Sequence, residues 1–264
     1  MAERVEHVMG MPVRVDVRDR AAGLAAVDRV FAWLRFVDAT FSTYDSQSQI
    51  SRLGRGEMGR SDAHRLVNEV LDRCEELRVA TDGAFDVHAP LPGAVDPSGF
   101  VKGWAVERAA ALLEQGGERH FLIDAGGDVV LRGGPWRVGI RHPRRRDRLA
   151  AVLELHDGAV ATSGAYERGP HIVDPRTGGP ACGAQSVTIV GPDLGTADAY
   201  ATAAFAMGER GPAWTATVED HAAMTILPGD RVLATTGFLR HCAGPSIAGS
   251  LRAREEMHLS LIHI

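Results

Sequence analysis

The sequence predicts an α+β fold, with largely antiparallel sheets flanked by helices. Two observations support this prediction. The first half of the chain is dominated by long amphipathic helical patterns, whereas the part from Phe121 onward is a series of short β-rich segments separated by glycine or proline turns. Helices and strands are therefore partly segregated along the chain, whereas a doubly wound parallel sheet would require them to alternate.

The first half of the chain predicts one strand and two helices. Val13–Val17 alternates apolar and polar residues as a strand does, and a helical pattern follows from about Ala21 to Thr40. After a polar turn, a second amphipathic helix is expected from about Asp62 to Thr81. The pair Asp82-Gly83 should end it, because a residue that tolerates positive φ is a common helix stop.

A third helix and a series of strands are predicted in the rest of the chain. The segment Gly99–Gly103 leads into a helix from Trp104 to about Gln115, which Gly116-Gly117 should stop. A last hairpin is expected around Pro228-Gly229-Asp230. Between them lie four segments typical of antiparallel strands: FLIDAGGDVVLRG, WRVGIRHP, AAVLELHDGAVATSG and QSVTIVG.

The length and composition indicate one large domain. With 264 residues, 45% of them hydrophobic, the chain can bury a substantial core, and we expect a single domain over residues 1–250 and a tail over 251–264. Residues 259–264, LSLIHI, back-translate to a transposon-end adapter used in preparing sequencing libraries, so we expect this segment to be adapter read-through. The net charge of −5 argues against nucleic acid as a partner.

The compartment is predicted from three further features. Cys74, Cys182 and Cys242 are far apart and form no CxxC pair, which argues against a disulfide framework and a structural zinc site. The first residues lack the apolar core of a secretory signal, and no apolar run is long enough for a transmembrane helix. We therefore expect a cytoplasmic protein without stable membrane insertion.

A basic run, RHPRRRDR, covers Arg141–Arg148. A solvated hairpin loop is the interpretation that this pattern favours, and an acidic protein partner is the alternative.

The signatures of several common catalytic sites are absent, since the sequence contains no GxxxxGK[ST] loop, no HExxH helix and no GxSxG elbow. Two single residues are candidates. His171 lies in a turn-rich segment, where it either accepts a proton from a hydroxyl nucleophile or only hydrogen-bonds the loop. Lys102 lies near the expected start of a helix, where a cation beside free amides suits a phosphate but is also often simply exposed.

The segment TADAYATAAFAMG, residues 196–208, predicts a buried helix because it is almost entirely apolar. It nevertheless carries Asp198 and Thr202, whose spacing puts both side chains on one helix face. In a structural interpretation, Thr196 caps the helix, Asp198 meets the helix dipole in the first turn and Thr202 bonds back to a carbonyl. In a functional interpretation, these hard oxygen donors hold Mg²⁺. The residues alone leave both interpretations open.

An ordered set of motifs runs along residues 8–238: Met9-Gly10, Thr40–Tyr44 with Ser48 and Ile50, Thr81–Asp86, Val95–Val106, Asp124–Asp128, Ala161–Tyr166, His171–Gly178 and Ala197–Ala203. In this order they resemble the ApbE family of FAD:protein FMN transferases. The resemblance implies an ApbE-like fold and a Mg²⁺-dependent enzyme. Such an enzyme splits FAD at its pyrophosphate, links FMN through a phosphoester to a Thr or Ser of an acceptor protein, and releases AMP.

The resemblance also implies roles for single residues. Asp198, Thr202 and the backbone carbonyl of Val101 would bind Mg²⁺, His171 would activate the acceptor hydroxyl, and Lys102 would act on the phosphates of FAD. Further contacts with FAD are expected from four segments, those of Met9, Tyr44, Asp86 and Val187. An FAD pyrophosphatase that yields FMN and AMP is the alternative within enzymes, and a non-catalytic FAD-binding protein is the alternative outside them.

The chain departs from the family pattern at three places. Val87-His88 replaces a usual threonine, Val101 replaces a usual alanine, and Gly54 stands where an asparagine is common. The first and third changes concern flavin contacts, whereas a change of side chain at Val101 is harmless if only its carbonyl binds the metal.

Overall fold

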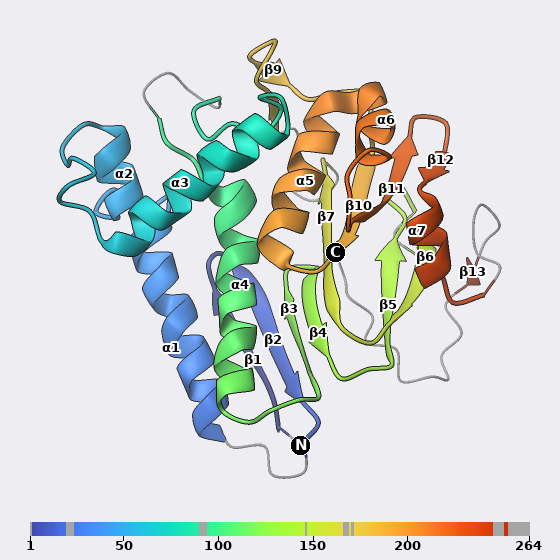
Figure 1. Ribbon diagram of the computed structural model, residues 1–264, viewed down its shortest axis with the longest axis horizontal. Helices are drawn as coiled ribbons and strands as arrows, with labels where there is room; N and C mark the ends of the chain where they lie inside the picture. Colours follow the sequence, from blue (N-terminus) through green and yellow to red (C-terminus); the bar gives the residue numbers. More distant parts are fainter. Residues whose placement is uncertain are drawn as a thin grey trace.

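The main feature of the computed structural model is a long antiparallel sheet with helices on one face (Figure 1). The structure describes residues 2–19, 24–89, 94–145, 147–165, 169 and 172–244, and the backbone of 251–252. Within this part of the chain every strand pair is antiparallel, so the predicted α+β class is confirmed. The eight strands of the main sheet are, in spatial order, β1 (Ala2–Val8), β2 (Met11–Val17), β3 (Phe121–Ala125), β4 (Asp128–Arg132), β7 (Gly158–Gly164), β10 (Ser186–Gly191), β11 (Ala222–Leu227) and β12 (Arg231–Ala234).

Two smaller sheets accompany the main one. β5 (Trp136–Arg141) and β6 (Arg148–Leu155) form a hairpin to which β13 (Leu251–Arg252) adds its backbone. β8 (Val173–Asp174) and β9 (Gly179–Pro180) form a short second hairpin.

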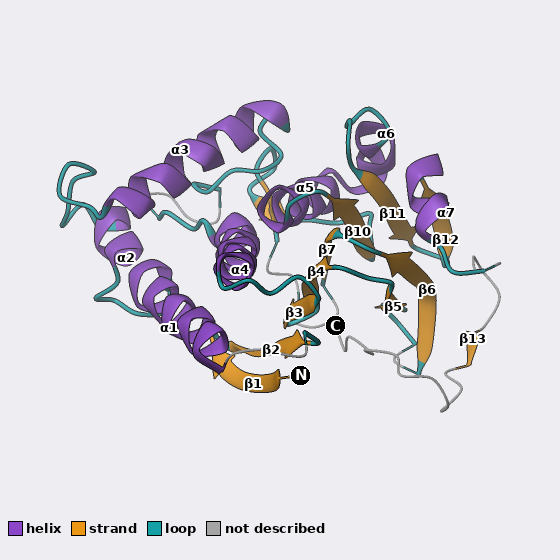
Figure 2. Cartoon of the chain, turned by 60° about the horizontal axis from the view of Figure 1, so that its bottom comes forward, coloured by secondary structure: helices purple, strands orange, loops and turns teal. Residues whose placement is uncertain are grey.

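The helices form a layer over the main sheet, as Figure 2 shows. Among the described residues, α1, α4, α5 and α6 contact the sheet on this face, and α4 lies between α1 and α5. The short helix α7 contacts the opposite face. The helices are α1 (Leu24–Phe41), α2 (Gln49–Gly54), α3 (Arg65–Ala80), α4 (Ser98–Gln115), α5 (Leu194–Met207), the 3₁₀ turn η1 (Gly208–Arg210), α6 (Gly211–Thr215) and α7 (Thr236–His241). In the part of the chain described, no helix combines the length and apolar composition that crossing a membrane requires.

The main sheet separates two hydrophobic cores because its strands alternate the faces on which they place side chains. Ile123 and Val130 point into the core beneath α1, α4 and α5, together with Phe31. Leu122 and Leu131 point the other way, into a core closed by β5, β6 and α7. Each large side chain buried in this way contributes roughly 1.5–3 kcal/mol to stability.

Most of the predicted elements are present, with shifted ends. The helix expected from Trp104 begins six residues earlier, at Ser98. The N–H of Ser98 donates to the carboxylate of Asp96 at 2.9 Å. The two glycines of the segment before Trp104 are therefore inside α4, where low helix propensity is overridden by tertiary packing. The hairpin around Pro228-Gly229-Asp230 is confirmed, whereas β1 was not predicted.

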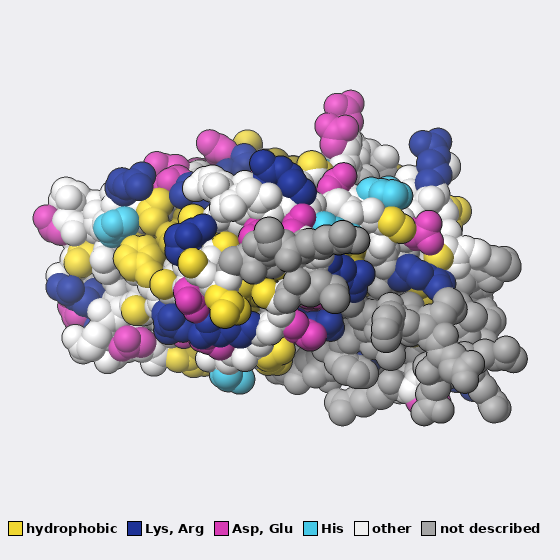
Figure 3. Space-filling model, turned by 90° about the horizontal axis from the view of Figure 1, so that it is seen from below, with side chains coloured by type: hydrophobic (Ala, Val, Ile, Leu, Met, Phe, Trp, Pro, Cys, Tyr) yellow, Lys and Arg dark blue, Asp and Glu magenta, His cyan; other side chains and the backbone are white. Residues whose placement is uncertain are grey.

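The basic run is a hairpin loop between β5 and β6, as predicted, but it is anchored to a neighbouring turn. The guanidinium groups of Arg144 and Arg145 lie 2.9 and 3.1 Å from the carboxylate of Asp230, between β11 and β12. Burial of His142, in the same loop, and the charge of Arg145 lower the pKa of its imidazole. On the face seen in Figure 3, basic and acidic side chains are interspersed over the described part of the surface.

The cysteines and the tail complete the comparison with the sequence. As the spacing predicted, all three cysteines are free thiols. Cys74 is buried and Cys182 is exposed. Residues 253–264 lie outside the described residues, so the boundary at residue 250 and the adapter origin of 259–264 stay predictions.

The crossing of α4 and α5 yields a first testable prediction. A Cβ at Gly103 would overlap the carbonyl oxygen of Leu194, whereas one at Gly99 would lie 3.2 Å from the side chains of Phe85 and Thr202. Alanine favours a helix over glycine by about 1 kcal/mol. We nevertheless expect Gly103→Ala to lower the free energy of unfolding, by about 1–3 kcal/mol, because the backbones must separate.

Urea unfolding of Gly103→Ala and Gly99→Ala measures this effect. Gly99→Ala is the matched control, since its neighbours are side chains that can move. Equal or greater stability of Gly103→Ala than of the wild type would show that the helices do not cross this closely.

Candidate functional site

The candidate site lies where α4 and α5 run antiparallel in close contact. Gly99 faces Thr202, since a Cβ on this glycine would lie 3.2 Å from the Thr202 hydroxyl. One turn further along α4, the N–H of Gly103 donates to Oδ2 of Asp198 at 3.3 Å. The steps of four residues on both helices keep these pairs on facing sides. As the sequence predicted, Asp198 and Thr202 therefore share one face, and this face is turned toward α4.

Asp198 is buried beside a lysine and a second carboxylate. Its side chain is 4% exposed, and Nζ of Lys102 lies 3.5 Å from its Oδ1. Lys102 also forms an ion pair with Oδ2 of Asp128, a side chain 2% exposed. The other oxygen of Asp128 accepts the backbone N–H of Thr162 at 2.9 Å. Two buried carboxylates thus share the ammonium of Lys102.

The charge on Asp198 is incompletely compensated. Burial raises the pKa of this carboxyl from 3.8 to about 7, the ammonium of Lys102 opposes the rise, and the negative charge of Asp128 adds to it. A carboxylate in such surroundings gains from any further cation. This is a physical reason why the helix face would bind a metal.

Thr202 extends the polar cluster toward the sheet. Its hydroxyl lies 3.3 Å from Oγ of Ser163 in β7. In the antiparallel register Ser163 is opposite Val187 of β10, so the segment expected to contact FAD runs beside the cluster. Asp198, Thr202, Lys102 and Val187 therefore come together from three separate parts of the chain.

The start of α5 corrects one sequence prediction. Thr196 is not the N-cap, because the helix begins at Leu194 and the carboxylate of Asp193 accepts the N–H of Thr196 at 2.8 Å. Asp198 consequently lies in the second turn, one turn away from the free amides of the helix start. The first-turn role predicted for Asp198 is wrong, and its nearest positive group is instead Lys102 of α4.

Val101 and Lys102 also lie in a different setting from the one predicted. Both are inside α4, in its first two turns, rather than ahead of a helix. The side chain of Val101 is buried. Lys102 is directed toward Asp128 and Asp198, so the interpretation of a simply exposed lysine is wrong.

The donors at this cluster fit a hard cation. Among the described residues no three His, Cys, Asp or Glu side chains gather as a metal site would usually require. Asp198 and Thr202 instead supply one carboxylate and one hydroxyl. Mg²⁺ accepts such a set, because it prefers oxygen ligands and keeps sites open for water and phosphate. The undercompensated charge of Asp198 supports the same fit.

The remaining site residues are dispersed. Tyr44 is 97% exposed on the loop after α1. In the β1–β2 turn, the N–H of Met9 donates to the carboxylate of Asp38, a residue of α1, at 3.0 Å. Asp86 accepts the N–H of His88 at 2.8 Å, and the neighbouring Phe85 packs where α4 begins. The structure thus does not bring Tyr44, Met9 or Asp86 into direct contact with Lys102 or Asp198.

His171 lies outside the described residues, but the turn that follows it is well defined. Asp174 accepts the N–H of Arg176 at 3.0 Å and its guanidinium at 2.8 Å, between β8 and β9. Asp174–Gly178 therefore forms a turn, in the segment that the sequence indicated to be rich in turns.

Sequence reasoning missed two residues of the cluster, Asp128 and Ser163. Both belong to motifs that the sequence singled out, and each is a polar residue within a β-rich, otherwise apolar segment. That pattern was the only available signal, since a buried polar residue requires a partner. Their partners, Lys102 and Thr202, are distant in sequence and could not be assigned before the fold was known.

Comparison with protein-family models decides the relationship of this chain to known proteins. The model of the ApbE family matches residues 9–92 and 91–226. This chain belongs to the ApbE family. The relationship predicted from the ordered motifs is therefore confirmed.

Two relatives share 32% and 37% of the aligned residues with this chain. The FAD:protein FMN transferase of Vibrio cholerae is 37% identical over 130 residues, which cover 44% of this chain and 39% of the relative. The protein of the same name from Treponema pallidum is 32% identical over 204 residues, covering 66% of this chain and 56% of the relative. The matched regions thus span less than two thirds of these relatives.

Solved ApbE structures share the fold. The flavin transferase ApbE from Vibrio cholerae superposes with a TM-score of 0.80 at 24% identity, over 91% of this chain and 98% of the other. The ApbE protein from Thermotoga maritima gives the same TM-score and identity over the same shares. The ApbE-like arrangement of antiparallel sheet and helices is therefore confirmed.

The raised pKa of Asp198 yields a second prediction. An acid that holds its proton more tightly in the folded state stabilises the fold below its unfolded pKa and loses that contribution as the pH rises to its folded pKa. In metal-free buffer, the free energy of unfolding should therefore fall between about pH 4 and pH 7 by a contribution on the order of a few kcal/mol from this group. Asp198→Asn should remove this contribution.

Urea unfolding of both proteins at several pH values, with a chelator present, isolates the contribution as the difference between their profiles. Asp62→Asn, at an exposed position, is the control. Parallel profiles for the wild type and Asp198→Asn would contradict a raised pKa at Asp198.

Proposed function

We propose that this chain transfers FMN from FAD to a Thr or Ser hydroxyl of an acceptor protein, with Mg²⁺ bound and AMP released. The observation that carries the proposal is the α4–α5 face, where Asp198, Thr202 and Lys102 converge at one polar cluster. Membership of the ApbE family supports it, as do the relatives named FAD:protein FMN transferase. A cytoplasmic location, or an acceptor at the cytoplasmic side of a membrane, is part of the same proposal.

The carboxylate of Asp198, the hydroxyl of Thr202 and the carbonyl of Val101 would hold the metal ion. When bound, Mg²⁺ supplies positive charge against the pyrophosphate oxygens of FAD and favours a hydroxyl attack on phosphorus. The three protein donors come from only two helices, so the rigidity of the α4–α5 contact fixes the spacing of the metal ligands.

Lys102 would provide the second positive group. The buried carboxylate of Asp128 pairs with its ammonium and holds it beside Asp198. From there Lys102 would bind a phosphate oxygen of FAD and stabilise the charge that develops as AMP departs. Because the ammonium is held before FAD binds, little rearrangement is needed at the time of reaction.

His171 would accept the proton of the acceptor hydroxyl. The hydroxyl oxygen forms a bond to the phosphorus of the FMN moiety, and the bond from that phosphorus to the bridging oxygen breaks. AMP leaves with the electron pair of the broken bond.

The flavin and adenine ends of FAD would contact the more dispersed residues. The exposed ring of Tyr44 offers an aromatic face for stacking, and Val187 lies in the strand beside the cluster. Met9 and Asp86 would complete the contacts from the β1–β2 turn and the turn after α3.

One assay tests the proposed reaction against its alternatives. The protein is incubated with FAD, Mg²⁺ and an acceptor that carries an Asp-Gly-x-Thr/Ser motif, and acceptor mass and free AMP are followed. We expect an adduct of the mass of FMN and an equal amount of AMP, both dependent on Mg²⁺. FMN and AMP without adduct would indicate a pyrophosphatase, and tight FAD binding without AMP would indicate a binding protein.

Variants of the ion pair test the role of Lys102. Lys102→Met should lower kcat for transfer at least about 100-fold, because a positive group near the transition state is lost. Asp128→Asn should have a smaller effect, since the lysine remains but is held less firmly. Single-turnover rates of both variants, with Arg137→Gln as a distant control, check this order. Full activity of Lys102→Met would refute the role.

A further inference from the structure

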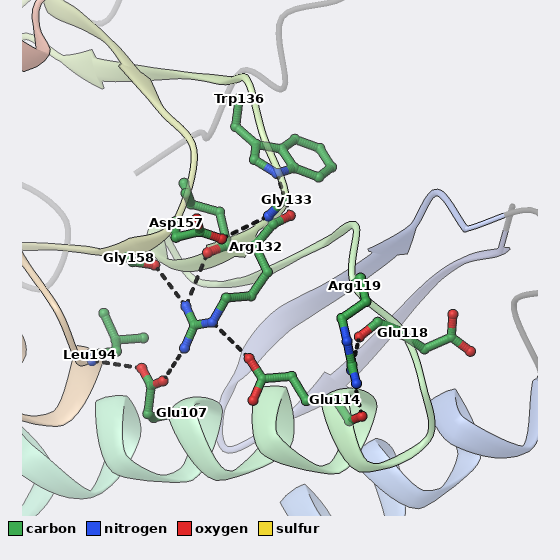
Figure 4. A network of polar contacts seen from close by, with 11 residues as sticks. Glu107, Glu114, Glu118, Arg119, Arg132, Gly133, Trp136, Asp157, Gly158 and Leu194 are labelled. Atoms are coloured by element: carbon green, nitrogen blue, oxygen red, sulfur yellow. Dashed lines mark hydrogen bonds and ion pairs between the residues drawn. The ribbon is translucent and has the colours of Figure 1, made fainter.

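Glu107 joins the start of α5 to the main sheet through Arg132 (Figure 4). Its Oε2 accepts the backbone N–H of Leu194, the first residue of α5, at 2.9 Å. Its Oε1 lies 2.6 Å from a guanidinium nitrogen of Arg132, the last residue of β4. Figure 4 shows the two contacts on opposite sides of the Glu107 carboxylate. One carboxylate therefore links three elements, α4, α5 and β4.

Arg132 is itself held by several acceptors, which fix the position of Glu107. Its Nε lies 2.9 Å from the carboxylate of Glu114, about two turns beyond Glu107 on α4. Its Nη1 donates to the carbonyl oxygens of Leu131 at 3.0 Å and Gly158 at 3.3 Å. The side chain of Arg132 is 19% exposed and that of Glu107 is 25% exposed, so water competes only weakly for these contacts.

Glu107 continues the contacts between α4 and α5 that form the candidate site. Gly99 faces Thr202, Gly103 donates to Asp198, and Glu107 accepts from Leu194. Each step is four residues forward on α4 and four residues back on α5. The three contacts therefore form a regular series on one pair of facing helix sides, and a shift of one helix along the other would break all of them together.

The glycines alone do not fix this register. Gly103 and Gly195 remove side chains at the crossing and allow close approach, but a smooth contact also permits sliding. Gly103 donates to Asp198 at 3.3 Å, a long contact. The contacts of Glu107, at 2.9 and 2.6 Å, are shorter, and one of them joins two charges. Of the polar contacts between α4 and α5 described above, that of Glu107 with Leu194 is the shortest.

We propose that Glu107 is a positioning residue that locks the register of α5 against α4, and so sets the spacing of Asp198, Thr202 and the Val101 carbonyl. The inference rests on the proposed function for the identity of the metal, but not for the register itself. Loss of the link should weaken Mg²⁺ binding without removing a ligand. Outer partners that orient metal ligands typically contribute 10–100-fold in metal affinity.

Three variants test the proposal. Glu107→Ala removes both contacts, Glu107→Gln keeps an oxygen that accepts the Leu194 N–H, and Glu114→Gln is the matched control because it alters a partner of Arg132 that does not touch α5. Calorimetric titration with MgCl₂ should give an affinity at least tenfold weaker for Glu107→Ala. Glu107→Gln should recover most of this loss, and Glu114→Gln should stay within about twofold of the wild type.

Two further measurements separate positioning from a general loss of stability. Hydrogen exchange at the amide of Leu194 should be faster in Glu107→Ala but not in Glu114→Gln. In the transfer assay, under conditions where Glu107→Ala is fully folded, its kcat should be restored only at higher Mg²⁺ than the wild type needs, whereas a merely destabilised protein would show the wild-type Mg²⁺ dependence once folded. Should Glu107→Ala fail to fold, Glu107→Met, which fills similar space but accepts no hydrogen bond, gives the same comparison with Glu107→Gln.

The outcomes are distinct from those for the proposed function. Unchanged Mg²⁺ affinity and unchanged Leu194 exchange in Glu107→Ala would overturn the positioning role. If the wild type itself bound no Mg²⁺, the proposed metal site would fail, while faster Leu194 exchange in Glu107→Ala alone would still establish that Glu107 fixes the register.

Discussion

The close contact between α4 and α5 is the constraint on which the site depends. Gly103 and Gly195 bring the two backbones together, because a Cβ at the first would overlap the carbonyl of Leu194 and one at the second would lie 2.9 Å from the ring of Phe100. At this separation a main-chain N–H of one helix reaches a carboxylate on the other. Larger side chains at the crossing would move Asp198 away from Lys102, and the polar cluster would then be lost.

The same contact explains why a helix as apolar as α5 can carry a carboxylate. Most of its residues are buried between α4 and the strands β7 and β10, and its alanines leave little space for water. Burial without a partner would destabilise the charged form of Asp198 by several kcal/mol. Lys102 of α4 reduces this penalty, but its ammonium also forms an ion pair with Asp128. The cluster is therefore stable enough to fold and still short of positive charge, a combination typical of functional sites.

The sequence allowed the fold to be predicted because its signals are local. Alternating apolar residues mark β2, glycine and proline turns mark the hairpins, and helical periodicity marks α1 and α3. The helix ends were less predictable. α4 includes Gly99 and Gly103, which local propensity excludes from a helix, and they are tolerated because their missing side chains make room for α5.

The candidate site was predictable in part, for the same physical reason. The spacing of Asp198 and Thr202 on one helix face is a local property, and the face is correctly predicted. The positively charged residue that lies beside this face, Lys102, could not be identified in the same way. It depends on contacts between residues far apart in sequence, which are seen only in the folded structure. Asp128 and Glu107 could not be assigned from local pattern, since their partners Lys102 and Leu194 follow from the packing of α4.

The polar groups around α5 have different energetic roles, which follow from how completely each is paired. Glu107 accepts one N–H and faces Arg132, so its contacts are made in the folded protein before any ligand arrives. The ammonium of Lys102 lies 3.5 Å from Asp198, and the N–H of Gly103 donates to it over a long 3.3 Å. Asp198 therefore has more interaction energy to gain from a further cation. A cation bound at Asp198 would therefore stabilise the fold as well as the reaction, because it binds the folded chain alone. The fully paired carboxylate fixes the helix, and the partly paired one is left to bind.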